Sequence, residues 1–143
     1  MKRIFGLAVV FAALFAAAAF GAQFGRLSVE VPAGWTATQE DSTVGIVKND
    51  NSASMSITLA SKDGASLEEL AAAYAQQLNG SAPQKMTEGK FAGDYVFEFT
   101  NANGIKCEGL VSGDDTDYIL IVVAGADNAQ AELEAIMDSI GLN

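Results

Sequence analysis

The stretch "YILIVVA", residues 118–124, decides the fold because it is apolar throughout and offers no polar side. A strand with two apolar faces must be covered on both of them, so this segment predicts the central strand of a sheet. Just before it, "GDDTD" (113–117) has the composition of a turn. Residues 105–112 then predict a neighbouring strand, which is antiparallel because the connection is short.

Working outward, "DYVFEFT" (94–100) predicts a third strand, with Tyr95, Phe97 and Phe99 on one face. Asn103-Gly104 separates it from 105–112. This dipeptide is a strong hairpin signal, because both residue types tolerate positive φ. The second half of the chain is therefore an antiparallel meander.

In the first half of the chain, apolar and polar residues also alternate along the predicted strands. Leu27, Val29 and Val31 alternate with polar residues, and the Pro32–Gly34 turn ends that strand. Further strands are predicted at 35–40, 44–47 and 54–59, with a weak one around 84–88.

Two helices interrupt the strands. Ser66 and Glu69 form a capping box that starts a helix running from Leu67 to about Asn79, with Gly80 as its stop. Residues 127–142 predict a second helix with Gly141 as its stop, and its apolar stripe consists of Leu133, Ile136, Met137 and Ile140.

The order strands, helix, strands, helix indicates an α+β fold of one domain, residues 23–143. We expect a mainly antiparallel sheet flanked by helices, an α/β/α sandwich with one helix on each face.

This pattern resembles the PsbP-like fold superfamily. "LSVEVPAGWTATQED" (27–41) is similar to the opening of that family, in which a strand runs into a Pro-x-Gly-Trp turn. The mid-chain helix, the Asn-Gly hairpin, "YILIVVA" and the ending "IMDSIGL" (136–142) resemble it too. The superfamily includes photosystem extrinsic subunits, a Ran-binding nuclear import factor, DcrB-type periplasmic proteins and uncharacterised bacterial exported proteins, and the last group is the most similar in style. Its members share no one activity, so the resemblance implies a fold and carries over no site residue.

The first 22 residues predict a secretory signal peptide. Lys2 and Arg3 precede an apolar run, and two small-x-small patterns, 17–19 and 19–21, place cleavage near residues 19 to 22. The expected location is therefore periplasmic or secreted. An uncleaved membrane anchor is the alternative, because residues 4–22 approach the length that spans a bilayer. The only Cys is Cys107, so the cleavage-site Cys of a lipoprotein signal is missing.

The net charge of the chain limits the classes of partner that it can bind. Without Lys2 and Arg3, six basic residues remain against 18 acidic ones, a net charge of −12. Such a domain repels nucleic acid and anionic membrane surfaces, so neither is an expected partner once the signal is cleaved.

Chemistry is limited by composition. The chain has no His and one Cys, which removes Ser-His-Asp and Cys-His arrangements and the usual zinc sites. Asp114, Asp115 and Asp117 offer oxygens for calcium, yet a register starting at Asp115 places Ile119 at the fifth position, so a solvated turn is the better interpretation. We therefore predict no catalytic, cofactor-binding or metal residues and no required cofactor.

Three remaining features have structural interpretations. Cys107 lies on an alternating strand and is expected to be a buried core residue, with an intermolecular disulfide or reactive thiol as the alternative. The aromatics of 94–100 are expected in the core, with a pocket lining as the alternative. Trp35, the only Trp, follows a tight turn and is expected to be a buried plug rather than a recognition residue.

Two classes of function remain. The first is a small non-enzymatic exported protein that binds another protein, for example in an envelope complex. The second is a small-molecule binding module that uses a groove between sheet and helix. An apolar cavity beside the aromatic strand favours the second class, whereas a packed sheet with an exposed apolar patch favours the first.

Overall fold

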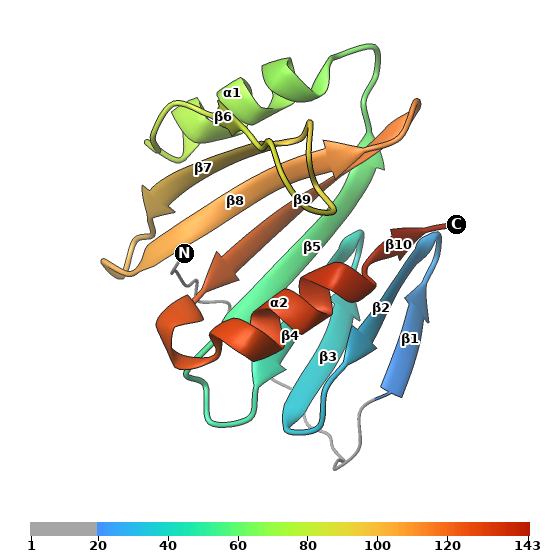
Figure 1. Cartoon of the computed structure of the whole chain (residues 1–143), viewed down its shortest axis with the longest axis vertical. Helices are drawn as coiled ribbons and strands as arrows, with labels where there is room; N and C mark the ends of the chain where they lie inside the picture. The colour runs from blue at the N-terminus through green and yellow to red at the C-terminus, as the bar shows by residue number, and fades with distance from the viewer. Residues whose placement is uncertain (1–19) are drawn as a thin grey trace.

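The computed structural model describes residues 20–143, which form an α+β fold with two antiparallel sheets and two α-helices (Figure 1). The seven-stranded sheet has the order β3-β4-β5-β9-β8-β7-β6, and the three-stranded sheet has the order β1-β2-β10. The elements are β1 (Phe20–Phe24), β2 (Leu27–Val31), β3 (Trp35–Glu40), β4 (Thr43–Lys48), β5 (Ser54–Ser61), α1 (Leu67–Gln77), β6 (Gln84–Lys85), β7 (Tyr95–Thr100), β8 (Lys106–Gly113), β9 (Asp117–Ala124), the 3-10 helix η1 (Ala126–Asn128), α2 (Gln130–Ser139) and β10 (Gly141–Leu142).

The predicted central strand is confirmed, because β9 lies between β5 and β8 in the middle of the large sheet. Its side chains alternate between two cores. Ile119 and Ile121 belong to the core on one face, and Leu120 and Val122 belong to the core on the other. This is why the segment has no polar side.

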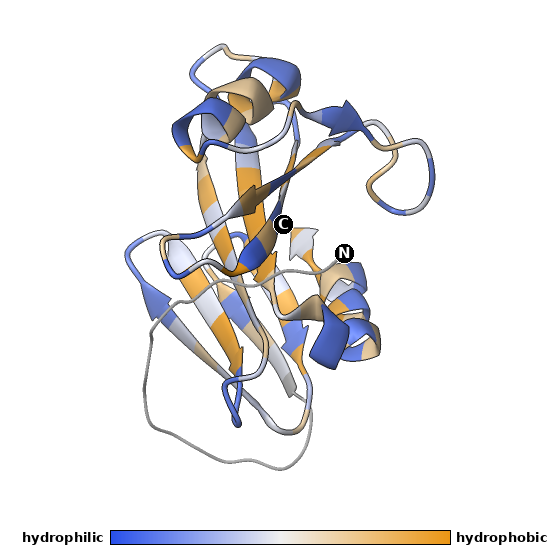
Figure 2. Ribbon diagram, turned by 90° about the vertical axis from the view of Figure 1, so that its left-hand side faces the viewer, coloured by the Kyte–Doolittle hydropathy of each residue, from blue (hydrophilic) through white to orange (hydrophobic). Residues whose placement is uncertain are grey.

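Each helix covers a different face of the large sheet (Figure 2). Leu133 and Ile136 of α2 are buried with Ile121, in the core that also receives the inward side chains of β2. Ala71 and Ala75 of α1 are buried in the opposite core. The expected antiparallel sheet with two helices is thus confirmed.

The three-stranded sheet was not predicted. β1 is "FGAQF", which in the sequence continues an apolar leader, and β10 is only two residues long. The prediction that the second helix runs over 127–142 was wrong at both ends. η1 precedes the helix, α2 ends at Ser139, and Gly141 and Leu142 pair with Ser28 and Leu27 of β2.

Two predictions about turns need correction. At the hairpin between β7 and β8 only Gly104 has positive φ, 79°, because Asn101 Oδ1 accepts hydrogen bonds from the N–H groups of Asn103 and Ile105 and shapes a longer loop. After α1, the left-handed residue is Asn79, with φ 58°. Gly80 is required for another reason, since a Cβ there would lie 2.6 Å from the carbonyl oxygen of Glu98.

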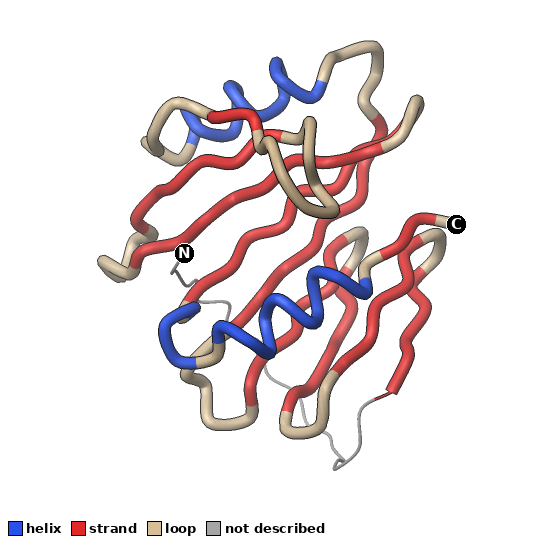
Figure 3. The backbone as a smooth tube through the Cα atoms, in the orientation of Figure 1, coloured by secondary structure: helices blue, strands red, loops and turns tan. Residues whose placement is uncertain are grey.

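A long loop connects β6 to β7 and reaches the C-terminal end of α2 (Figure 3). Phe91 of this loop is buried in the α2-side core. Lys90 Nζ donates a hydrogen bond of 2.7 Å to the carbonyl oxygen of Asp138. The last turn of α2 contains no basic residue of its own, so Lys90 supplies the cation that the negative end of the helix dipole favours.

The predicted signal peptide lies mostly outside the described residues, which begin at Phe20. Its last three positions, Phe20–Ala22, belong to β1 and pair with Val31, Glu30 and Val29. The expected boundary between residues 22 and 23 therefore falls inside a strand. Within residues 20–143, no helix has the length and apolar character needed to cross a bilayer.

Candidate functional site

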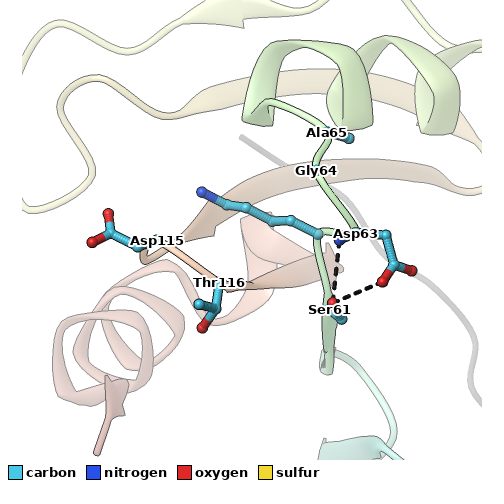
Figure 4. A pocket seen from close by; sticks show the side chains of 7 residues that line it. Ser61, Asp63, Gly64, Ala65, Asp115 and Thr116 are labelled. Carbon is cyan, nitrogen blue, oxygen red and sulfur yellow. Dashed lines mark hydrogen bonds between the residues drawn. The ribbon is translucent and has the colours of Figure 1, made fainter.

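A hollow of about 380 Å³ opens to solvent between two loops of the large sheet (Figure 4). One wall is the loop between β5 and α1, and the other is the turn between β8 and β9. The loops are held together by the Lys62 N–H, which donates to the carbonyl oxygen of Thr116 at 2.9 Å. The lining residues are Ser61, Lys62, Asp63, Gly64, Ala65, Asp115 and Thr116.

Polar groups of the hollow bond to one another. Ser61 Oγ donates to Asp63 Oδ1 at 3.1 Å and accepts from the Asp63 N–H at 3.2 Å. This pairing stabilises a loop in which Asp63 and Gly64 both have positive φ. A serine beside a carboxylate, without a stronger base, is not an activated nucleophile. The hollow therefore has no catalytic arrangement among its lining residues.

The start of α1 lies next to the hollow, and a capping box uses two of its N–H groups. Ser66 Oγ accepts from the Glu69 N–H at 3.1 Å, and Glu69 Oε1 accepts from the Ser66 N–H at 2.9 Å, so the predicted capping box is confirmed. Glu68 and Glu69 also place negative charge where an anion would approach. The negative charge of these two side chains disfavours an anion at this helix end.

Asp94 is a carboxyl that sequence reasoning missed. Burial raises its pKa, while a hydrogen bond with Ser112 and the charge of Lys62 oppose that rise. Nothing in the sequence marked this residue, because its burial depends on the β6–β7 loop. A carboxyl shifted upward by burial is a feature of many active sites, but no nucleophile–base–orienter geometry accompanies it here.

The acidic turn that the sequence offered for calcium is held by an arginine. Arg26 Nη2 donates to Asp114 Oδ2 at 2.7 Å, and Arg26 Nη1 donates to Asp117 Oδ2. Asp114 Oδ1 accepts from the N–H groups of Thr116 and Asp117 at 3.0 and 2.9 Å. We call Arg26, Asp114 and Asp117 the Arg26 cluster. The Arg26 hydrogen bond, followed by the two backbone N–H groups, holds the pKa of Asp114 well below its usual range.

The Arg26 cluster joins the two sheets. Arg26 lies in the turn between β1 and β2, whereas both aspartates flank the turn between β8 and β9. Arg26 Nε also donates to the carbonyl oxygen of Asn143 at 2.8 Å, and the Asn143 N–H returns a bond of 2.8 Å to the Arg26 carbonyl oxygen. The role of the Arg26 cluster in joining the two sheets therefore accounts for its three charged residues without a bound ion. Over residues 20–143, no group of three His, Cys, Asp or Glu side chains is arranged to hold a metal ion.

Trp35 is 4 % exposed, which confirms that it is a buried residue. Sequence reasoning missed its partner. Trp35 Nε1 donates to Glu132 Oε2 at 2.9 Å, and Lys48 Nζ donates to Glu132 Oε1 at 3.0 Å. Lys48 Nζ also lies 5.7 Å from the centre of the Trp35 ring. These contacts fasten α2 to β3 and β4.

The aromatic strand β7 leaves no room for a ligand beside Phe97. A Cβ placed on Gly109 would lie 2.5 Å from Phe97 Cζ, so the ring lies directly on the backbone of the next strand. Gly80 approaches the same ring from the α1 side, where a Cβ would lie 3.2 Å from Phe97 Cδ2. Phe97 and Phe99 are 2 % and 8 % exposed, which confirms that these two are core residues, while Tyr95 is half-buried.

Two further groups lie in the α1-side core. Cys107 is 1 % exposed, which confirms its predicted burial. The Tyr74 and Tyr118 hydroxyls are 2.6 Å apart and share a hydrogen bond. Burial, followed by that bond, raises the pKa of Tyr118 to about 12. The sequence contained no signal for this pair, because the two residues are 44 positions apart.

Comparison with known proteins adds no relative. No protein-family model matches the chain, and no curated protein matches it. Fold and side-chain geometry are therefore the basis for a functional proposal.

Proposed function

We propose that this chain is a small exported protein that acts by binding another protein and catalyses no reaction itself. The observation that carries the proposal is the packing of Phe97 against Gly109 and Gly80. A groove between sheet and helix is what a small-molecule binding module needs. That space is filled beside the aromatic strand, which supports protein binding over the small-molecule alternative.

The scarcity of large exposed apolar side chains among the described residues limits how such binding occurs. Among residues 21–143, Ile105 is the single large hydrophobic residue that is exposed, at 41 %. A partner recognised through an apolar patch is therefore not supported, so of the two features that would favour protein binding only the packed sheet is present. Recognition through polar side chains and backbone groups is the mode that fits this surface.

Export and absence of catalysis belong to the same proposal. The positive start, apolar run and small-x-small patterns of residues 1–22 support export to a periplasmic or extracellular location. The lack of any His, together with carboxylates that bond to turns and to Arg26, supports a non-enzymatic role.

We also propose that the domain is a PsbP-like α/β/α sandwich. The Pro-x-Gly-Trp turn between β2 and β3, the single helix in mid-chain and the C-terminal helix on the opposite face support this. The family shares no one activity, so this proposal concerns architecture and not function.

The test uses the full-length gene in the producing cell. In-cell cross-linking followed by purification should give a reproducible covalent adduct with another protein. A second preparation is purified in the same way without cross-linker. Native mass spectrometry of this second preparation should give the mass of the polypeptide alone, with no bound small molecule. A stoichiometric small-molecule adduct without a protein adduct would replace the proposal with the small-molecule alternative.

A further inference from the structure

The two edges of the large sheet are protected to different degrees. At one edge, β6 is only two residues long, and Ser81 continues the pairing beyond it. The Ser81 N–H donates to the carbonyl oxygen of Glu98 at 2.8 Å, and Ser81 Oγ accepts from the Glu98 N–H at 3.0 Å. A very short edge strand is a usual way to limit further pairing at a sheet edge.

The other edge, β3, is six residues long, and its one charged residue is Glu40 at the open end. It pairs with β4 in an unbroken register from Trp35–Lys48 to Glu40–Thr43, without a bulge. Its sequence, "WTATQE", contains no Pro, Lys or Arg. Charged residues, prolines and bulges are the devices that natural sheets place on an open edge.

The direction of the N–H groups identifies which backbone atoms are available. The Trp35 N–H donates to the carbonyl oxygen of Pro32, and the Gly34 carbonyl oxygen accepts from Asn49, which follows β4. Even-numbered residues of β3 therefore face β4, and the alternation of the strand turns the N–H and C=O groups of Ala37 and Gln39 outward. Among residues 20–143, no backbone group bonds to these outward groups.

Exposure and charge show where an added strand fits. Trp35 is buried, Ala37 and Thr38 are half-buried, and Gln39 and Glu40 are exposed. Glu40 and Asp41 make the open end of the edge acidic. A second copy of this chain carries the same excess of acidic over basic residues and the same two acids, so like charges oppose self-pairing. A segment that carries Lys or Arg has the complementary charge.

We infer that the outer edge of β3, Ala37–Glu40, binds an extended segment of a partner protein by strand addition, and that this segment carries Lys or Arg opposite Glu40 and Asp41. The inference rests on the proposed function, because it names the surface and partner chemistry for that protein binding. Backbone bonds to Ala37 and Gln39 supply the contact, as in other strand-addition complexes. Charge at the open end then selects the partner.

The test uses two synthetic peptides, "KVTVTK" and its acidic twin "EVTVTE", with the protein in three forms. Gln39→Pro removes an outward N–H and places a ring on the edge, while leaving the bonds to β4 in place. Ala102→Pro, in the exposed turn between β7 and β8, is the matched control. The wild type and Ala102→Pro should bind "KVTVTK", and Gln39→Pro should bind it about tenfold or more weakly, since one hydrogen bond and its neighbours are lost.

Amide hydrogen exchange gives a readout that does not depend on folding of the variant. The Ala37 and Gln39 amides of the wild type should exchange rapidly when free and become protected by "KVTVTK" but not by "EVTVTE". Protection of both amides in the free protein would overturn the inference, whether another part of the chain or a second copy causes it. Equal binding of the two peptides, or equal binding by Gln39→Pro, would overturn it too.

In-cell cross-linking of the wild type and Gln39→Pro separates the two proposals. Loss of the wild-type protein adduct in Gln39→Pro supports strand addition at β3. Retention of that adduct would overturn the β3 site and leave the proposed function standing. Absence of any protein adduct from both would overturn the proposed function itself, and with it the biological meaning of the β3 edge.

Discussion

Trp35 Nε1 donates a hydrogen bond of 2.9 Å to Glu132 Oε2, and this bond joins the start of β3 to the first turn of α2, 97 residues away. The second carboxylate oxygen accepts from Lys48. The bond from Trp35, ahead of the one from Lys48, lowers the pKa of Glu132. The ring itself is buried in the α2-side core, so one side chain packs this core and orients the helix that covers it.

Replacing Trp35 with Ala should destabilise the domain by about 3–5 kcal/mol, as large-to-small core changes do. That is a large part of the roughly 5–15 kcal/mol that holds an ordinary domain together. Chemical denaturation followed by circular dichroism measures the change. Trp35→Phe is the control, because it keeps a phenyl ring but loses the indole N–H and part of the buried volume, so it should destabilise the domain less than Trp35→Ala does. A Trp35→Ala variant as stable as the wild type would contradict the structural role.

Lowering the pH should weaken the Arg26 cluster. The pKa of Asp114 is depressed in the folded state, so its stabilising effect is present above the unfolded value of about 4 and is lost as the pH falls below it. The free energy of unfolding of the wild type should therefore exceed that of Asp114→Asn at pH 6, and the difference should shrink towards pH 2. Asp115→Asn, in the same turn but outside the cluster, should follow the wild type. A difference that does not depend on pH would be evidence against the cluster.

Raising the pH should reduce the free energy of unfolding through the late ionisation of Tyr118. Its pKa of about 12 is raised above the ordinary value of about 10, so the stability linked to it is present below pH 10 and is lost as the pH rises towards 12. An absorbance titration of tyrosinate should show a late ionisation step near pH 12, and Tyr118→Phe should remove that step. Tyr74→Phe should leave the pKa of Tyr118 above 10, because burial is the larger cause. A titration of the wild type without that late step would contradict the raised pKa of Tyr118.

Periodicity predicted the large sheet and both helices, because burial of one face or two leaves a direct record in the sequence. "YILIVVA" shows this most clearly, since each face of β9 meets a different core. The Ser66–Glu69 capping box could also be predicted from the sequence, because its two residues are only three positions apart.

Contacts between segments that are distant in the sequence could not be predicted, because no local pattern marks them. β10 is two residues long, and its pairing with β2 depends on where α2 ends. The partners of Trp35 and Arg26 lie 97 and 88–91 positions away, and many other acids in the sequence were equally eligible. The open edge of β3 was also invisible, because only the order of strands shows which strand is last.

Removal of the leader should leave β1 intact. Cleavage after Ala19 makes Phe20 the first residue and keeps all five β1 residues paired with β2, whereas cleavage after Gly21 removes two of them. We therefore expect the cleavage after Ala19, and the intact mass of the protein from the producing cell measures it. A recombinant chain starting at Gly25 should melt at a lower temperature than one starting at Phe20. Retention of Met1 would instead favour the membrane anchor.

Two strand glycines provide the most direct check on packing between α1 and the sheet. Gly109 lies under the Phe97 ring, where a Cβ would lie 2.5 Å from Phe97 Cζ, so Gly109→Ala must displace a buried ring. Overpacking of this kind costs about 1–3 kcal/mol. Gly45 lies on β4 and would place a Cβ no closer than 3.9 Å to Thr38 Oγ1, so Gly45→Ala is the matched control and should be neutral or stabilise by up to about 1 kcal/mol. Chemical denaturation of the two variants gives both values. If Gly109→Ala were tolerated as well as Gly45→Ala, free space would have to exist beside Phe97, and the small-molecule alternative would regain its groove.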